Sequence, residues 1–170
     1  MIVFVFGLPG SGKSYFASRL AIMINAGYVN SDRLRKEMFK NRTYSAQEKA
    51  SVYHAMLEKM KGALAQNNNL VLDATFQKLE TRMPFIQETE GKEGIFFIEV
   101  RADQNIIRER LKKSRPDSEA DFEVYKFIQQ HWEPLNKPHL LLESTDKNIN
   151  GMLKKAAEYL HWKDDKGTDQ

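Results

Sequence analysis

The chain has 170 residues, with 26 basic and 23 acidic side chains, a formal net charge of +3 and no cysteine. The missing cysteines exclude disulfides, thiolate metal sites and a cysteine nucleophile. A hydrophobic content of 41% is typical of a globular protein, and no apolar run approaches the ~20 residues that a membrane helix requires. We expect one cytoplasmic domain over residues 1–162, without membrane contact, and a polar, disordered tail over residues 163–170.

The charge balance gives little support for nucleic acid as a partner. A pI near 9.0 is only mildly basic, and nucleic-acid-binding proteins are marked by clusters of basic residues more than by their total. The one basic cluster runs from Arg101 to Arg115. It lacks the interleaved aromatic residues that a groove for single strands would offer.

Apolar periodicity and turn residues predict strands and helices that alternate along the chain. In chain order we expect a strand at 2–6, a helix at 13–25, a strand at 28–30, helices at 32–39 and 45–65, a strand at 70–72, a helix at 79–90, a strand at 95–100, helices at 103–113 and 119–131, a strand at 140–142 and a helix at 148–161. Ser45 and Glu48 have the spacing of a capping box at the start of the third helix. Pro84 must lie in the first turn of its helix or kink it.

Unbroken apolar strands separated by helices predict an α/β fold with a parallel sheet covered on both faces. Right-handed crossovers bring the C-terminal end of every strand to one edge of that sheet. Candidate catalytic residues should therefore come directly after the strands.

A glycine-rich segment, Gly7 to Ser14, lies between the first strand and the first helix and reads G-x-x-x-x-G-K-S. In that context its backbone N–H groups and the helix N-terminus favour phosphate, Lys13 reaches the β- and γ-phosphates, and Ser14 reaches Mg²⁺. The alternative is an ordinary glycine turn before a helix. The residues expected to bind the nucleotide are Gly7, Pro9, Gly10, Ser11, Gly12, Lys13, Ser14 and Tyr15.

The second strand is followed by Asp32 and Arg35, which are three residues apart at the start of a helix and so project from one side of it. The aspartate could accept a proton from an attacking hydroxyl, and the arginine could hold an anionic group of the acceptor. The alternative is that Asp32 merely caps the helix.

The third strand ends at Asp73, where an acidic residue after a buried apolar run resembles the Walker-B position that supports Mg²⁺. The alternative is a turn carboxylate at the strand end. The basic stretch suggests a lid over about residues 108–122, in which Arg110 or Arg115 stabilises the transferring phosphoryl group. The alternative there is a solvated basic face.

Four segments together resemble a known group of kinases. They are Gly7 to Ser14, Asn30-Ser31-Asp32 with Arg35, Asp73-Ala74-Thr75-Phe76 with Arg82, and the lid residues Arg110 or Arg115 with Ser118-Glu119-Ala120-Asp121. Over about residues 1–135 the chain is similar to small AAA-type P-loop kinases, which are related to the 5′-hydroxyl kinase domain of polynucleotide kinases and, more distantly, to zeta toxins. Many members have Ser-Asp-Ala in the lid, so the lid register is open by a residue or two.

The resemblance implies a P-loop NTPase sandwich of three layers, α/β/α, with a five-stranded parallel sheet in order 2-3-1-4-5 and a helical lid. The roles it implies are ATP binding by Lys13, Mg²⁺ binding by Ser14 and Asp73, general base catalysis by Asp32, acceptor binding by Arg35, Asp73, Thr75 and Arg82, and contact with the β- and γ-phosphates by Arg110 or Arg115.

We therefore predict a Mg·ATP-dependent kinase that transfers the γ-phosphate to a hydroxyl group, in the manner of a polynucleotide kinase. The acceptor stays open, because a small alcohol, a nucleoside, a nucleic acid 5′-end and a sugar nucleotide all suit an Asp–Arg pair. Two alternatives are an ATP-binding or ATPase switch module without an acceptor, and a toxin-like kinase of a nucleotide sugar.

Overall fold

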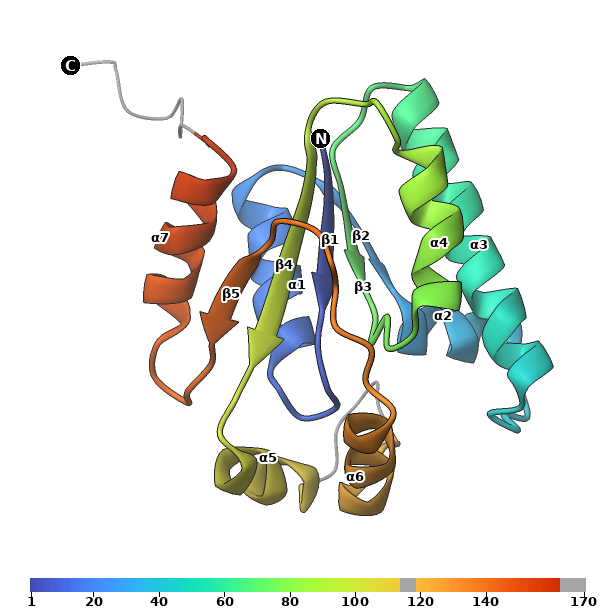
Figure 1. Cartoon of the computed structure of the whole chain (residues 1–170), viewed down its shortest axis with the longest axis vertical. Coiled ribbons are helices and arrows are strands. Elements are labelled where there is room, and N and C mark those ends of the chain that lie inside the picture. The colour runs from blue at the N-terminus through green and yellow to red at the C-terminus, as the bar shows by residue number, and fades with distance from the viewer. Residues whose placement is uncertain (114–118, 163–170) are drawn as a thin grey trace.

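The computed structural model describes residues 1–113 and 119–162, which form one parallel sheet with helices around it (Figure 1). The strands have the predicted order β2-β3-β1-β4-β5. Their bounds are β1 Ile2–Phe6, β2 Gly27–Asn30, β3 Leu70–Asp73, β4 Ile95–Arg101 and β5 Leu140–Glu143. The helices are α1 Lys13–Met23, α2 Ser31–Met38, α3 Ala46–Ala65, α4 Leu79–Glu88, α5 Gln104–Leu111, α6 Phe122–Gln130 and α7 Ile149–Tyr159.

The central strand β1 is buried along its whole length and divides the core in two. Because successive side chains of a strand point to opposite faces, Phe4 and Phe6 pack on one side with residues of α3 and α4. Val3 and Val5 pack on the other side with α1 and α7. Two apolar faces explain why the strand sequences are unbroken apolar runs, and they give the fold its three layers.

The strand register aligns the C-terminal ends that matter for function. Val5 pairs with Asp73, and Asp73 in turn pairs with Asn30, so the ends of β1, β3 and β2 lie side by side. The glycine-rich segment leaves this same edge after Phe6. Figure 1 shows α5 and α6 below this edge of the sheet, in the place expected for a lid.

The start of α3 follows the predicted capping pattern in part. The Ser45 side chain accepts a hydrogen bond from the Glu48 backbone N–H at 3.2 Å. The Glu48 carboxylate does not return to the Ser45 N–H; instead it accepts from Thr43 N at 2.6 Å and Tyr44 N at 3.2 Å. Glu48 therefore organises the loop before the helix, a role that the pattern alone did not indicate.

Some helix ends differ from the prediction. The helix expected at 119–131 begins at Phe122, and the Asp121 side chain caps it by accepting from Val124 N, so residues 119–121 precede the helix. Pro84 lies inside α4 beyond its first turn, which makes the first-turn alternative wrong. The expected lid tip, residues 114–118, and the expected tail lie outside the described residues. Within the part of the chain that the structure describes, no helix combines the length and apolarity needed to span a bilayer.

The aromatic cluster between the sheet and α4 should carry much of the stability. Phe85 is 2% exposed and makes edge contacts with Phe4, Phe76 and Tyr53. We expect Phe85→Ala to lower the free energy of unfolding by about 3–5 kcal/mol, because it removes a buried ring and leaves a cavity. Urea unfolding measures this loss. Phe127→Ala, at a side chain that is 61% exposed, is the control and should change stability by less than about 0.5 kcal/mol. Equal effects of the two substitutions would contradict the assignment of Phe85 to the core.

Candidate active site

The glycine-rich loop is shaped by close contacts that only glycine permits. Gly7 has a φ of 152°, and a Cβ there would lie 2.2 Å from the carbonyl oxygen of Val100 in β4. Gly12, with a φ of 89°, is the N-cap of α1, and a Cβ there would lie 2.7 Å from Ser144 Oγ. The loop is thus held tightly between β4 and the segment after β5.

The N-terminus of α1 is arranged to attract an anion. The capping residue Gly12 offers no side-chain hydrogen bond, and the first turn contains no acidic residue. The first N–H groups of the helix are therefore left without capping by a side chain or compensation by a carboxylate, which suits phosphate. Lys13 folds back over the loop, with Nζ donating to Leu8 O at 3.5 Å.

A hydrogen-bonded network joins the ends of α1, β2 and β3. Asn30 Nδ2 lies 2.6 Å from Asp73 Oδ2 and 3.3 Å from Ser14 Oγ. The Tyr28 hydroxyl donates to the same Asp73 Oδ2 at 2.7 Å. Asp73 is 0% exposed, yet its second oxygen, Oδ1, is buried without a hydrogen-bond partner. Burial, followed by the negative charge of Asp73, raises the pKa of Tyr28 well above its ordinary value, so Tyr28 remains a hydrogen-bond donor.

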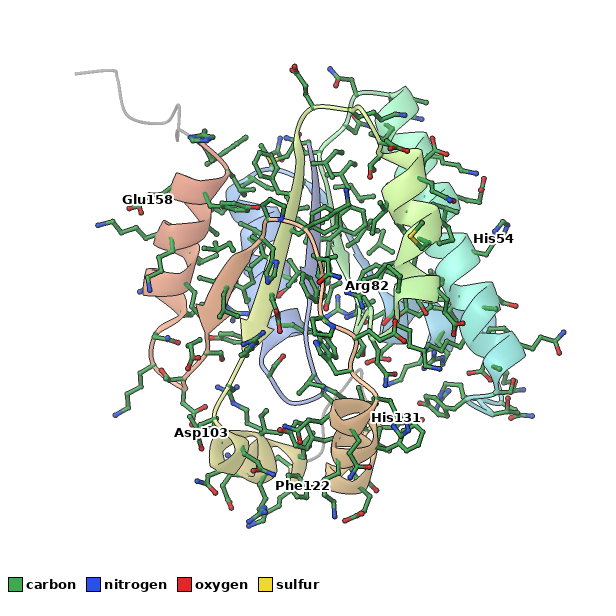
Figure 2. All side chains as sticks on the ribbon, viewed as in Figure 1. His54, Arg82, Asp103, Phe122, His131 and Glu158 are labelled. Atoms are coloured by element: carbon green, nitrogen blue, oxygen red, sulfur yellow. The ribbon has the colours of Figure 1, made fainter. Side chains whose placement is uncertain are left out.

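The Ser14 and Asp73 side chains fit a magnesium ion. A buried carboxylate oxygen without a partner is costly unless something binds it, and Mg²⁺ prefers oxygen ligands. Within the described residues, no group of three or more His, Asp or Glu side chains could hold a metal alone. Figure 2 shows the labelled His54 and His131 on separate helical segments, far from forming such a group. One protein carboxylate together with substrate phosphates is the usual way in which proteins bind this ion.

The predicted pair Asp32 and Arg35 is brought together at the start of α2. Arg35 Nη1 and Asp32 Oδ1 are 3.8 Å apart. The N-cap of the helix is Asn30, whose Oδ1 accepts from Arg33 N at 2.9 Å. Capping is therefore supplied by Asn30, and the presence of Asp32 is not explained by the cap alternative.

Arg35 is held from two further sides. Its Nε lies 3.1 Å from Oε1 of the buried Glu48, and its guanidinium lies 4.7 Å from the centre of the Tyr44 ring. Burial raises the pKa of Glu48, but its hydrogen bonds from Thr43 and Tyr44 and the charge of Arg35 outweigh it and hold that pKa below its ordinary value. Arg35 is consequently fixed in position, with its side chain 11% exposed.

A bridge connects the loop between α2 and α3 to the segment before α6. Glu119 accepts from Arg42 Nη2 at 2.6 Å and from the Tyr44 hydroxyl. These two hydrogen bonds lower the pKa of Glu119 to about 2, so it stays ionised at neutral pH. Because the Tyr44 ring also lies over Arg35, this Glu119 bridge extends from the predicted lid region to the Asp32–Arg35 pair.

Arg110, predicted to contact the phosphates, lies on α5 against the glycine-rich loop Gly7 to Ser14, called the phosphate loop below. Its Nη1 donates to Gly10 O and to Ser144 Oγ, both at 3.2 Å. Its Nε and Nη2 donate to Asp146 Oδ1 at 3.1 and 3.0 Å. The loop backbone and the segment after β5 thus hold the guanidinium, and its contact with phosphate stays a prediction.

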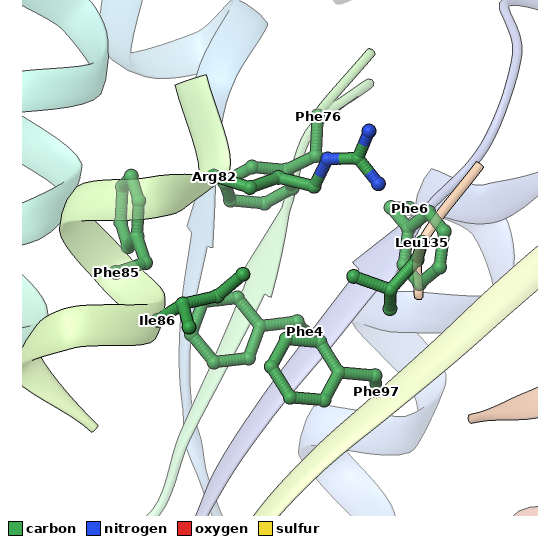
Figure 3. Close-up of a pocket in the computed structure, with 8 residues that line it drawn as sticks. All are labelled: Phe4, Phe6, Phe76, Arg82, Phe85, Ile86, Phe97 and Leu135. Atoms are coloured by element: carbon green, nitrogen blue, oxygen red, sulfur yellow. The ribbon is translucent and has the colours of Figure 1, made fainter. Parts of the chain in front are cut away.

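Arg82, predicted to bind the acceptor, lies in the core with its side chain turned toward a small apolar cavity (Figure 3). It donates to the carbonyl oxygens of Lys78 and Gln77, both at 3.2 Å, and to that of Glu133. Burial lowers its pKa. These contacts join α4 to the chain after α6, while Nη1 has no hydrogen-bond partner. Backbone carbonyl groups of the protein thus hold the Arg82 side chain, and its predicted role in binding the phosphate acceptor stays a prediction.

The other predicted site residues occupy less distinctive positions. Thr75 is half-buried in the turn after β3, two residues beyond Asp73. Tyr15 is 55% exposed on α1, and the Arg19 guanidinium covers its ring at 3.4 Å. Arg115 lies outside the described residues. The roles predicted for all three stay predictions.

Beside the loop, on the β4 side, lies a cavity of about 300 Å³. It is lined by Leu8, Ser11, Glu99, Arg101, Tyr125 and Trp132 together with four neighbouring residues. The buried carboxylate of Glu99 is already paired with Arg101 at 2.7 Å and lies 3.2 Å from His139 Nε2. The order of the sheet places this cavity across β1 from Asn30 and Asp73.

The sequence analysis missed several residues that shape the site. Tyr28 has a readable signal, because it lies two residues before Asn30 in a strand and so shares its face. Glu48 was recognised only as a capping residue, although it also faces Arg35. Glu119 was named only as part of the lid segment in the resemblance, and its contacts with Arg42 and Tyr44 were not foreseen because these partners are distant along the chain. Ser144 carries no signal in the sequence for the same reason.

Solved structures with the same fold include two kinases and a protein in complex with a nucleotide. A sugar kinase from Janibacter sp. HTCC2649 has a TM-score of 0.72 at 15% identity, with 94% of each chain covered. Kti12 from Chaetomium thermophilum, in complex with ADP-AlF3, has a TM-score of 0.69 at 19% identity, over 94% of this chain and 99% of that one. The APS kinase of Mycobacterium tuberculosis, with AMPPNP and APS, has a TM-score of 0.68 at 18% identity, over 94% of this chain and 96% of that one.

At these identities the structural likeness shows the fold, which is that of the P-loop NTPases. A sequence search of curated proteins finds no match. The family model described as AAA domain matches residues 2–135, from the start of β1 to beyond α6. This match spans well over half of the chain and includes the phosphate loop, Asp32 and Asp73, and the protein therefore belongs to the AAA domain family.

Proposed function

We propose that the protein is a Mg·ATP-dependent kinase that transfers the γ-phosphate to a hydroxyl group. The observation that carries this proposal is the 3.3 Å contact between Asn30 Nδ2 and Ser14 Oγ. It joins the phosphate loop directly to the start of α2, where Asp32 and Arg35 lie. A base and a cation beside a phosphate loop suit phosphoryl transfer, whereas a nucleotide switch has no need of a base there.

The nucleotide would bind through the loop and its lysine. The N–H groups at the start of α1 would hold phosphate oxygens, and Lys13 would leave Leu8 O for the β- and γ-phosphates. Ser14 and the free Oδ1 of Asp73 would hold Mg²⁺, which when bound neutralises charge on the phosphates. Of the two predicted lid arginines, Arg110 lies within the described residues, where it already contacts Gly10 and could make a further contact with phosphate.

In the transfer, the acceptor oxygen forms a bond to the γ-phosphorus while the bond between that phosphorus and the β–γ bridging oxygen breaks. Asp32 takes the proton of the acceptor hydroxyl, and ADP leaves with the electron pair of the broken bond. Fixed in place by Glu48 and Tyr44, Arg35 positions the acceptor through an anionic or polar group. Closure of the lid region would exclude water, which would otherwise compete as acceptor.

Two observations favour a small acceptor over a polynucleotide. The Glu119 bridge lies beside Arg35, so a nucleic-acid strand held by Arg35 would have to pass Tyr44 and its partner Glu119. The basic residues near the site are largely compensated, since Arg35 faces Glu48 and Arg42 faces Glu119. A sugar or another small alcohol fits these features best, and the sugar kinase with the same fold is consistent with that class. A 5′-hydroxyl end and a nucleotide sugar are the remaining acceptors to be tested.

The base assignment predicts a separation of binding from catalysis. Asp32→Asn should lower the rate of γ-phosphate transfer by about 10²–10⁴-fold, because the hydroxyl proton loses its acceptor. The nucleotide affinity of Asp32→Asn should be unchanged. Lys13→Ala should lose both phosphate transfer and nucleotide binding. Transfer of labelled γ-phosphate to a panel of sugars, nucleosides, nucleotide sugars and 5′-hydroxyl oligonucleotides measures the rate, and calorimetry measures ADP affinity. Glu37→Gln, an exposed acid-to-amide change on the same helix, is the matched control.

Near wild-type transfer by the Asp32→Asn variant would overturn the base assignment. ATP binding without transfer to any acceptor, combined with nucleotide-dependent capture of a protein partner, would favour the switch module instead. Growth arrest on expression that the Asp32 substitution relieves would favour the toxin-like kinase.

The bridge predicts an effect on the acceptor alone. Glu119→Ala should raise the KM for a small acceptor about threefold to tenfold, because two largely exposed hydrogen bonds over the site are lost. The KM for ATP should not change. Steady-state kinetics with the acceptor found in the panel measures both constants, and Glu109→Gln, which breaks an exposed ion pair on α5, is the control. A wild-type enzyme that prefers 5′-hydroxyl oligonucleotides would contradict the choice of a small acceptor.

A further inference from the structure

We propose that Tyr28 is a positioning residue that orients Asp73 for magnesium. The inference rests on the proposed function, since it concerns the metal that accompanies the nucleotide. It depends on one geometric fact, which is that both donors to Asp73 reach the same oxygen. Tyr28 and Asn30 contact Oδ2 at 2.7 and 2.6 Å, and Oδ1 is left without a partner.

The strand geometry brings these groups together. Asn30 and Asp73 are paired in register on adjacent strands, so their side chains leave the same face of the sheet. Tyr28 lies two residues before Asn30 and therefore points to that face as well. It packs against the core cluster beneath α1, and Ser14 lies in the first turn of that helix. In the strand register Tyr28 pairs with Val71, so it lies two residues further than Asn30 from the edge at which the phosphate loop begins.

The orientation of the Asn30 amide is fixed by chemistry. Its Oδ1 accepts from the Arg33 backbone N–H, which can only donate, so Nδ2 must be the atom that faces Asp73. That same Nδ2 is also within 3.3 Å of Ser14 Oγ. The Asn30 side chain therefore contacts the Asp73 carboxylate, the Ser14 hydroxyl and the start of α2, and it is not dedicated to orienting Asp73.

Tyr28 supplies the restraint that Asn30 lacks. With one donor, the Asp73 carboxylate can rotate about its Cβ–Cγ bond and exchange its two oxygens. Donors arriving at Oδ2 from two residues hold that oxygen on the β2 side, and Oδ1 then points consistently elsewhere. Residues that orient a metal ligand in this way typically affect metal affinity by 10–100-fold when they are removed. Removing the Tyr28 hydroxyl should accordingly lower the affinity for magnesium more than the affinity for nucleotide.

The test is Tyr28→Phe, which removes only the hydroxyl group. Binding of a fluorescent ADP analogue to the full chain is measured first in EDTA and then across a magnesium titration. We expect the magnesium midpoint to rise about tenfold, with the affinity in EDTA unchanged. Tyr159→Phe is the matched control, because Tyr159 packs against the same core cluster from α7, and its midpoint should equal that of the wild type.

An unchanged magnesium midpoint in Tyr28→Phe would overturn the inference. A parallel loss of affinity in EDTA and in magnesium, together with a lower melting temperature, would also overturn it, because it would make Tyr28 a purely structural residue. Magnesium-independent nucleotide binding by the wild type would overturn the proposed metal site itself, and that result is distinguishable because it does not involve the variant.

Discussion

The structure depends on a buried negative charge at the end of β3. Asp73 is fully enclosed, and an ionised carboxylate in that position costs several kcal/mol unless hydrogen bonds compensate for it. The donors come from the neighbouring strand, so β2 must present Tyr28 and Asn30 on one face and in register. Asn30 also caps α2, and its contacts with Asp73 and Ser14 fix the start of that helix, where Asp32 lies, beside the phosphate loop. One buried charge thereby orders a strand, the start of a helix and the position of Asp32 and Arg35.

Much of this arrangement follows from local patterns in the sequence. Apolar runs and helical periodicity are set by residues close together in the chain, and the parallel topology then brings the strand ends to one edge. The phosphate loop, the parallel sheet and the proximity of Asp32 to Arg35 could be inferred from these patterns alone, whereas the order of the strands was implied only by the resemblance to P-loop kinases. The catalytic roles that we propose for Asp32 and Arg35 are of a different kind, because such a role depends on a bound acceptor and not on the fold alone.

Contacts between distant residues were beyond such inference. Arg82 donates to a carbonyl oxygen 51 residues away, and Glu119 meets Arg42 across 77 residues. Either arginine could equally have faced a ligand, because a guanidinium offers the same donors to a carbonyl, a carboxylate or a phosphate. For Arg82, packing between α4 and the chain after α6 decides which of these groups the guanidinium meets. No short sequence pattern encodes that packing. Helix ends are hard to predict from sequence for a related reason, because several neighbouring polar residues could each cap the helix, and only the structure shows that Asp121 caps α6.

The contact of Gly7 with β4 divides the site into parts of unequal stiffness. A loop whose backbone is pressed against the Val100 carbonyl, and which is also bonded to Arg110, has almost no room to move. On the Arg35 side, Arg42, Tyr44 and Glu119 join the loop before α3 to the predicted lid region, and an exposed ion pair such as Arg42–Glu119 contributes at most about 1 kcal/mol. If the protein is the kinase we propose, closure over its substrates would be expected on the side of Arg42, Tyr44 and Glu119, where the contacts are weaker. Nucleotide would then meet a preformed surface, while the acceptor would meet one that still has to assemble around it.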